Sequence, residues 1–230
     1  MTESTVLAHL REAILTLELS PGQPLSERGL EPRLGASRTP IRAALMQLSG
    51  EGLVQREGRG WIVAPLDLDE LTALTEYREA LETAGVRLAI LRASDDQLRA
   101  LAGLLPSLSL SDDPEQGIGS GTNFHHALAT LSGNQFVIGA LDGVLTRLYR
   151  TRWLEVRSTE SRKRAANEHE AVVAALLQRD APAAEEAVRR HLRGTMERLQ
   201  SQLNDGRQTL RARGVNLAGS AGVGSASPSA

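Results

Sequence analysis

The sequence contains no cysteine, which excludes a disulfide framework, thiolate catalysis and thiolate metal sites. Aromatic residues make up only 3% of the 230 residues, so leucine, alanine, valine and isoleucine must form the core, which favours packed helices over a β-sandwich. No run approaches the ~18 apolar residues of a membrane-spanning helix, and the N-terminus lacks the basic-then-apolar pattern of a signal peptide. We therefore expect a soluble, cytoplasmic protein that does not act at a membrane.

Lysine is almost absent as well, since Lys163 is the only lysine among 26 basic residues. The net charge of −2 argues against a general nucleic-acid coat protein. The charge is unevenly distributed. Residues 28–60 hold six arginines and three glutamates (net +3), whereas residues 66–206 hold 16 basic and 21 acidic side chains (net −5). A small basic region on an otherwise acidic chain is typical of a protein in which one domain binds specific DNA.

Residues 35–66 predict a helix followed by a two-stranded wing. Ser37 is a suitable N-cap, and Pro40 falls in the first turn, where proline is tolerated. Two short strands, 53–56 and 61–63, follow, with a glycine-containing hairpin turn between them. The polar residues expected on the exposed face of the helix can pair with base edges or phosphates in a major groove. They are Ser37, Arg38, Thr39, Arg42 and Gln47.

Two further helices precede this stretch. The apolar spacing predicts a first helix that stops at residues 20–22 (Ser-Pro-Gly) and a second from Ser26 to about Leu34. Three helices and a wing, with the third helix reading the DNA, is the plan of a winged helix-turn-helix domain. We expect Trp61 to pack at the base of the wing. Three arginines are expected to contact phosphates or to be solvated, namely Arg33, Arg56 and Arg59.

Beyond a short linker over residues 66–69, the chain shows no alternating strand pattern. Apolar spacing predicts about six helices between residues 70 and 205, which would pack as a bundle, with a loop over residues 106–120. Residues 206–230 are expected to form a disordered tail. The fold class is therefore mainly α, with a winged helix-turn-helix domain (residues 1–65) followed by an all-α bundle. Three arginines of the bundle are expected on a solvated face, namely Arg147, Arg150 and Arg152.

Three of the five histidines fall on inward faces of the predicted helices. His169 and His191 share helical faces with apolar residues, and His125 lies in line with apolar positions one turn further on. Three inward histidines from three helices can converge on a divalent cation, and neutral imidazole suits several transition metals. The alternative is that all three are hydrogen-bonded core residues. We expect His126 and His9 at the surface.

Residues 19–28, 34–45 and 51–54 resemble the N-terminal domain of GntR-family bacterial transcription regulators. The resemblance covers residues 5–65 and implies which residues contact double-stranded DNA. These are Arg28, Ser37, Arg38, Thr39 and Arg42, together with Gly60 at the wing, which would approach the minor groove. One departure is Pro32 within the second helix, which should shorten or kink that helix.

Residues 77–82, 124–134, 168–180 and 187–192 resemble the all-helical FCD ligand-binding domain of the FadR subfamily of these regulators. In that family an Asp or Asn four residues before the first histidine joins three histidines around a metal, which in turn holds a small carboxylate effector. The resemblance implies a divalent transition metal such as Zn, Ni or Mn. Its ligands here would be His125, His169 and His191.

Gly121 stands where the family has its carboxylate or amide ligand, so a metal site in this chain would have three histidines and no anionic side chain. This loss should weaken metal binding. Arg78 is the implied clamp for the effector carboxylate, and the alternative role for Arg78 is a surface ion pair with Glu82 at i+4.

Together these features predict a transcription regulator, a repressor, that acts as a homodimer on a near-palindromic operator and responds to a small carboxylate. Two alternatives stay open. One is a metal-dependent enzyme with an appended DNA-binding domain, although we expect Glu168 and Glu170 to project away from the face of His169, so that no general base is evident. The other is a bundle that serves only for dimerisation.

Overall fold

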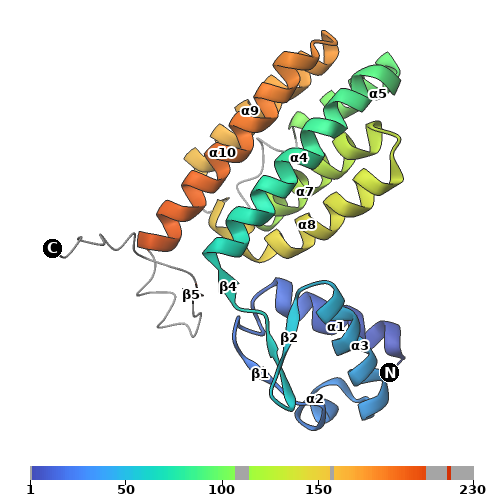
Figure 1. Ribbon diagram of the computed structural model, residues 1–230, viewed down its shortest axis with the longest axis vertical. Coiled ribbons are helices and arrows are strands. Elements are labelled where there is room, and N and C mark those ends of the chain that lie inside the picture. The colour runs from blue at the N-terminus through green and yellow to red at the C-terminus, as the bar shows by residue number, and fades with distance from the viewer. Residues whose placement is uncertain (1, 107–113, 156–157, 206–216, 219–230) are drawn as a thin grey trace, which may run out of the picture.

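The computed structural model describes residues 2–106, 114–155, 158–205 and 217–218, which form two domains joined by a short connection (Figure 1). The N-terminal domain combines three helices with a three-stranded sheet, and the C-terminal domain is a bundle of helices. The predicted fold class is therefore confirmed. Within the described ranges, none of the helices has the length and apolar character needed to cross a membrane.

The sheet of the N-terminal domain has the strand order β1-β3-β2, with both outer strands antiparallel to β3. Strand β1 adds to the two-stranded wing expected from the sequence, because Leu25 pairs with Trp61. Buried leucine, isoleucine and valine side chains from all three helices and from the strands form one core. The elements are α1 (Glu3–Leu15), β1 (Pro24–Leu25), α2 (Glu27–Leu34), α3 (Arg38–Gly50), β2 (Val54–Glu57) and β3 (Gly60–Val63).

The helix ends follow from local backbone chemistry, with some differences from the expected limits. Helix α1 ends at Leu15, earlier than expected, because the chain turns at Leu17, which has a φ of 63°. Helix α2 continues through Pro32 and ends two residues later, before Gly35, whose φ of 58° favours glycine. Ser37 occupies the N-cap position of α3, but its side chain makes no capping hydrogen bond.

Strand β4 leads from the wing into the long first helix of the C-terminal domain. Helix α7 occupies residues 114–120, so the prediction of a loop there is wrong. The glycine-rich composition of this segment disfavours a helix, but packing of α7 against α4 and α8 overrides that local preference. The elements are β4 (Leu66–Asp67), α4 (Leu68–Arg92), α5 (Asp95–Ala102), α7 (Pro114–Leu131), α8 (Gln135–Glu155), α9 (Thr159–Leu177) and α10 (Ala181–Asp205).

Two of the expected irregular segments fall in part outside the described residues. Residues 107–113 of the expected loop are among them, and so is the expected disordered tail apart from strand β5 (Leu217–Ala218). Strand β5 pairs in parallel with β4.

Helix α4 organises the bundle, since it packs against α7, α8 and α10 (Figure 1). The largest core cluster of this domain collects apolar side chains from α4, α5, α7, α9 and α10 around Phe124. Two charged side chains of α4, Arg78 and Glu82, are buried beside this core. The bundle therefore places polar groups of several helices inside an apolar interior.

Helix α8 also contacts the N-terminal domain. Arg150, which is only 3% exposed, donates a hydrogen bond from Nη1 to the carbonyl oxygen of Ala64. Arg147 pairs through Nη2 with Glu70 of α4, within the C-terminal domain. Gly52 of the N-terminal domain lies close to Arg147. A Cβ added at Gly52 would lie only 2.7 Å from Arg147 Nε, so a larger residue would not fit without a shift. Burial lowers the pKa of Arg150 to about 10, so it stays charged at neutral pH. The expectation of a solvated face is wrong for Arg150, which is buried, whereas the side chain of Arg147 is 37% exposed.

We expect Arg150→Met to loosen the contact between the domains. Methionine keeps most of the apolar stem but leaves the Ala64 carbonyl without its charged donor, and such a hydrogen bond contributes about 1.5–3 kcal/mol. The amides of residues 64–68 should then exchange about ten- to a hundredfold faster, as measured by hydrogen-exchange mass spectrometry. Arg164→Met is a matched control, because Arg164 pairs with Glu160 of its own helix. Equal exchange in the two variants would contradict the role of Arg150 in joining the domains.

Candidate metal centre and nucleic-acid interface

Three histidines from three helices meet in the core of the C-terminal domain. His125 of α7 has its Nε2 atom 3.2 Å from Nε2 of His169 of α9 and 3.3 Å from Nε2 of His191 of α10. One ligand atom from each residue lies within 4.8 Å of the others, and all three side chains are buried. The structure thus brings together the three histidines that the sequence singled out.

Carboxylates determine the tautomers of two of these histidines. Nδ1 of His125 lies 3.0 Å from Glu82 Oε2, and Nδ1 of His191 lies 2.8 Å from Glu168 Oε2. Because an ionised carboxylate can only accept a hydrogen bond, each Nδ1 carries the proton and each Nε2 keeps its lone pair. When both imidazoles are neutral, as metal ligation requires, the two Nε2 atoms 3.3 Å apart cannot hydrogen-bond to each other. Their lone pairs repel unless a cation lies between them.

An arginine in turn holds each carboxylate. Glu82 accepts a hydrogen bond from Arg78 Nε at 2.6 Å, and Arg198 donates to both oxygens of Glu168, at 2.9 and 3.0 Å. Burial alone would raise the pKa of Glu82, but the charge of Arg78 and the contact with His125 hold it well below its usual range. Burial would likewise raise the pKa of Glu168, but hydrogen bonds from His191 and Arg198 lower it to about 2. Both carboxylates are ionised at neutral pH.

The donor set fits a divalent transition metal. Burial is the main reason that the pKa of His125 falls to about 3, which makes this imidazole neutral, as metal ligation requires. Two imidazole nitrogens about 2.1 Å from one ion lie about 3.0–3.4 Å apart in tetrahedral or octahedral arrangements. The observed separations of 3.2 and 3.3 Å match that range. Imidazole ligands alone do not distinguish zinc, nickel and manganese.

Two further residues bear on what this site can hold. Gly121 is buried on α7 four residues before His125, and positions i and i+4 share a helix face. Arg78 is 4% exposed, so its ion pair with Glu82 is present but is not a surface pair. Arg78 Nη2 is buried and has no hydrogen-bond acceptor among the described residues. A buried donor of this kind is suited to a ligand carboxylate.

No sequence pattern indicates that Glu82 and Glu168 orient histidines. The i+4 spacing predicts that Glu82 pairs with Arg78. It gives no sign that Glu82 also contacts His125 on another helix. Glu168 projects away from the face of its neighbour His169, as expected, but it reaches His191 on the adjacent helix. Such a contact depends on how α9 and α10 are rotated against each other, which periodicity within one helix cannot reveal.

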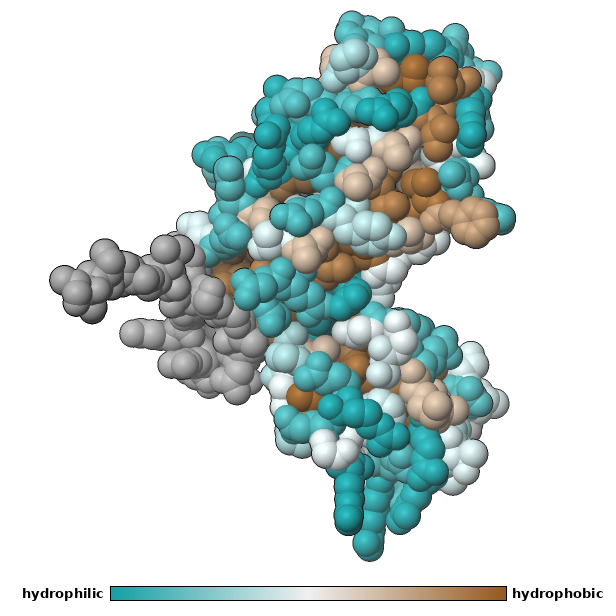
Figure 2. Space-filling model, viewed as in Figure 1, coloured by the Kyte–Doolittle hydropathy of each residue, from teal (hydrophilic) through white to brown (hydrophobic). Residues whose placement is uncertain are grey.

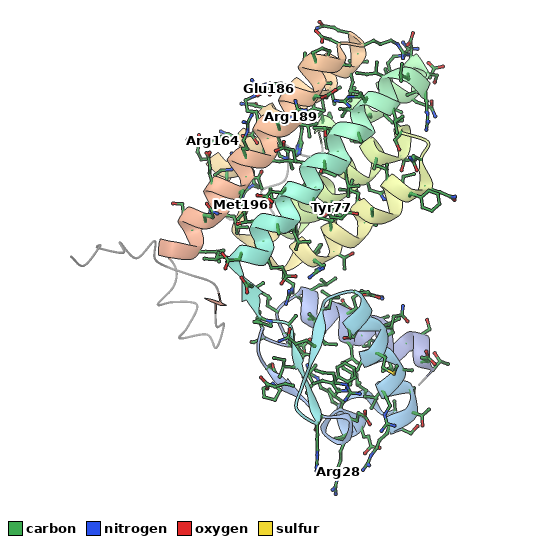
Figure 3. The ribbon with its side chains drawn as sticks, in the orientation of Figure 1. Arg28, Tyr77, Arg164, Glu186, Arg189 and Met196 are labelled. Atoms are coloured by element: carbon green, nitrogen blue, oxygen red, sulfur yellow. The ribbon has the colours of Figure 1, made fainter. Side chains whose placement is uncertain are left out.

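The residues predicted to contact DNA lie at the outer end of the N-terminal domain. Arg28 extends from α2 into solvent (Figure 3). Gly60, half-buried, begins β3 directly after the hairpin turn of the wing. The remaining residues are exposed at the start of α3, namely Ser37, Arg38, Thr39 and Arg42. The structure therefore leaves five of these residues exposed and Gly60 half-buried, and their contact with DNA stays a prediction.

Glutamates of α2 partner two of the arginines on α3. Glu27 accepts two hydrogen bonds from Arg42, from Nε at 2.9 Å and from Nη2 at 2.7 Å. Arg38 Nε lies 3.6 Å from Glu31 Oε1, a looser contact. Glu27 thus holds the Arg42 side chain in place and occupies two of its N–H donors. Arg38 is held less tightly, so its guanidinium is freer to turn towards a base edge.

The outer arginines of this domain have other surroundings. Arg56 stacks on Trp61, with its Cζ atom 3.8 Å from the ring centroid, and Trp61 is buried on β3 near the hairpin turn. Arg33 pairs with Glu18. Arg59 is exposed in the turn of the wing. Its role as a phosphate contact or a solvated charge stays a prediction.

Comparison with protein families and known proteins gives matches along most of the chain. Residues 2–63 match the family described as bacterial regulatory proteins, gntR family, and residues 73–194 match the FCD domain. A HTH-type transcriptional regulator in an unstable DNA locus of Streptomyces ambofaciens is 32% identical over 190 residues, which cover 82% of this chain and 80% of that protein. The HTH-type transcriptional repressor RspR of Escherichia coli (strain K12) is 27% identical, covering 82% of this chain and 84% of that protein.

Solved structures of similar fold exist. Escherichia coli McbR/YncC superposes with a TM-score of 0.73 at 21% identity, covering 87% of this chain and 97% of that chain. A GntR family transcriptional regulator from Pseudomonas syringae pv. tomato has a TM-score of 0.54 at 24% identity, covering 93% of this chain and 89% of that chain. At these identities the likeness shows a shared fold.

Proposed function

The chain belongs to the GntR family of bacterial transcription regulators and carries an FCD domain, and we propose that it is a repressor. A small carboxylate effector sets its affinity for the operator. The effector binds at a divalent metal that is held by three histidines. The family and the relatives are transcription regulators, not enzymes. The observation that carries the proposal is the pair of Nε2 lone pairs of His125 and His191, held 3.3 Å apart in a buried site by two carboxylates.

The N-terminal domain reads the operator with α3 in the major groove. Arg38 is the base-reading residue, since its guanidinium can pair bidentately with guanine. Thr39 contributes at its side, and Arg42 is presented by Glu27. Ser37 and Arg28 contact the phosphates, and the backbone at Gly60 approaches the minor groove. These roles follow from exposure, donor chemistry and the position of each residue on α2, α3 or the wing.

A homodimer places two such domains on the half-sites of a near-palindromic operator. Large apolar side chains are exposed on α4 and α8, with Tyr77 50% exposed and Leu91 and Phe136 each 78% exposed. Figure 2 shows brown and tan side chains gathered on this face of the helical domain, and Figure 3 places Tyr77 there. Exposed apolar surface of this kind is typical of a protein interface, so the dimer contact is assigned to α4 and α8.

The effector binds inside the bundle and acts on the DNA-binding domains through the arrangement of the helices. His125, His169 and His191 would hold the metal, which would supply a Lewis acid for a carboxylate. Arg78 offers its buried Nη2 to the same carboxylate, while Glu82 and Glu168 keep His125 and His191 in the ligating tautomer. Helix α8 packs on α7, which carries His125, and also contacts the wing domain through Arg150. A coupling of about 1–3 kcal/mol between effector and operator is typical of such regulators.

Metal content tests the proposal. Wild-type protein purified without chelator or affinity tag should contain about one transition-metal ion per chain, and His169→Ala should contain none, because two imidazoles hold an ion far less tightly than three. His126→Ala is the matched control, since His126 is half exposed and bonds to Asp142. Circular dichroism verifies that each variant is folded.

A wild-type protein without metal, even after addition of Zn, Ni or Mn, would contradict the metal part of the proposal. The bundle would then be a metal-free pocket or a module for dimerisation only. Uptake of a carboxylate by the metal-free protein would separate these two outcomes.

A further inference from the structure

We propose that in this chain the effector itself supplies the anionic ligand, so that a divalent metal and a small carboxylate bind at the three histidines as a pair, each weakly without the other. The inference rests on the proposed function and concerns the same site. It makes the protein a sensor of the coincidence of metal and carboxylate rather than of either alone.

The balance of charge around the histidines leads to this inference. Imidazoles must be neutral to ligate a metal, so they bring no charge of their own. Each nearby carboxylate is neutralised by its own arginine, Glu82 by Arg78 and Glu168 by Arg198. A divalent cation between the Nε2 atoms would therefore bring two uncompensated positive charges into a buried region. Burial of an unpaired charge is strongly unfavourable. Neutral ligands such as water would leave that charge in place, whereas an anion cancels part of it.

The part of the chain that the structure describes does not provide the anion. Among the described residues, the group of side chains close enough to hold an ion consists of the three histidines alone. Gly121, which is buried on the face of α7 that carries His125, has no side-chain ligand. Both carboxylates near the site are already engaged, each with a histidine Nδ1 atom and an arginine.

Arg78 points to the same conclusion independently of the metal. Its Nη2 atom is buried without an acceptor in the described part of the chain, while its Nε atom is occupied by Glu82. A carboxylate is the kind of ligand that would satisfy this donor. Because coupling between two ligands is reciprocal, the carboxylate raises the affinity for the metal by the factor by which the metal raises the affinity for the carboxylate.

The experiment measures the affinity of the full-length protein for Co(II), by visible absorption, with and without acetate at constant ionic strength set with sodium perchlorate. Acetate should raise the Co(II) affinity of the wild type by about tenfold or more, a coupling of about 1.4 kcal/mol. Gly121→Asp should bind Co(II) about tenfold more tightly than the wild type without acetate, and acetate should then add less than about threefold. Gly121→Ala, which adds bulk without a ligand, should behave as the wild type.

Tight Co(II) binding by the wild type that acetate does not change would overturn the pairing and leave the proposed metal site standing. Failure of the wild type to bind Co(II) in either condition would remove the metal from the proposed function, and the inference with it. If Gly121→Asp does not fold, the wild type with and without acetate still decides between these results.

Discussion

Arg38→Ala should sharply reduce discrimination between the operator and unrelated DNA. A bidentate arginine–guanine pair contributes about 1–3 kcal/mol of discrimination, and a dimer on two half-sites loses two such pairs, or about 2–6 kcal/mol. The ratio of specific to non-specific affinity should therefore fall by at least about thirtyfold. The side chain is exposed on the first turn of α3, so its removal should leave the fold intact.

The measurement needs an operator, which the wild-type protein can select from a random duplex library. Affinities for the selected duplex and for a scrambled duplex are then compared at two salt concentrations. Arg59→Ala is the control, because Arg59 lies in the turn of the wing. It should weaken binding to both duplexes about equally and reduce the salt dependence by about one phosphate contact per chain. Full sequence discrimination by Arg38→Ala would show that α3 does not present Arg38 to the bases of the major groove.

The winged domain was predictable from sequence because its signals are local. The glycine that ends α2, the position of Ser37 before α3 and the hairpin turn of the wing each lie within a few residues of the element they define. Strand β1 was not predicted, since only two residues pair with β3 and that pairing spans more than 30 residues of chain. Short strands held by distant partners carry little local signal.

The candidate site was predictable only in part, for a related physical reason. Burial of His125, His169 and His191 follows from the apolar neighbours on each helix, so periodicity identifies them. The contact between Glu168 and His191 depends on the packing of α9 on α10. The same applies to Arg150, which lies on the polar side of α8 and is buried only because another domain covers it. Patterns within one element cannot show what a second element covers.

Glu82→Gln should lower the free energy of unfolding of the helical domain by about 3–5 kcal/mol, the usual cost of removing one partner from a buried ion pair. Arg78 is 4% exposed and Glu82 is 3% exposed, so the arginine would stay buried with its charge uncompensated. Glutamine preserves the shape of the side chain, which limits the effect to the charge. The measurement is urea unfolding in the presence of a chelator, because a bound metal would add its own stabilisation.

Glu168→Gln provides the matched comparison. It removes the carboxylate from the other histidine–glutamate–arginine arrangement, but Glu168 and Arg198 have side chains 21% and 18% exposed. Partial hydration of Arg198 should limit the loss to less than about 2 kcal/mol. Equal losses in the two variants would show that burial of Arg78 does not set the cost.

The double variant Arg78→Met/Glu82→Leu separates stability from function at this position. It removes both charges together, so it should regain most of the stability lost in Glu82→Gln, because the buried region then contains no unpaired ion. It should nevertheless bind metal more weakly than the wild type, since His125 loses the carboxylate that holds its proton on Nδ1. A stable double variant with weakened metal binding would mean that the buried pair serves the orientation of His125 rather than the stability of the fold. Unchanged metal binding would show that His125 keeps its ligating tautomer without Glu82.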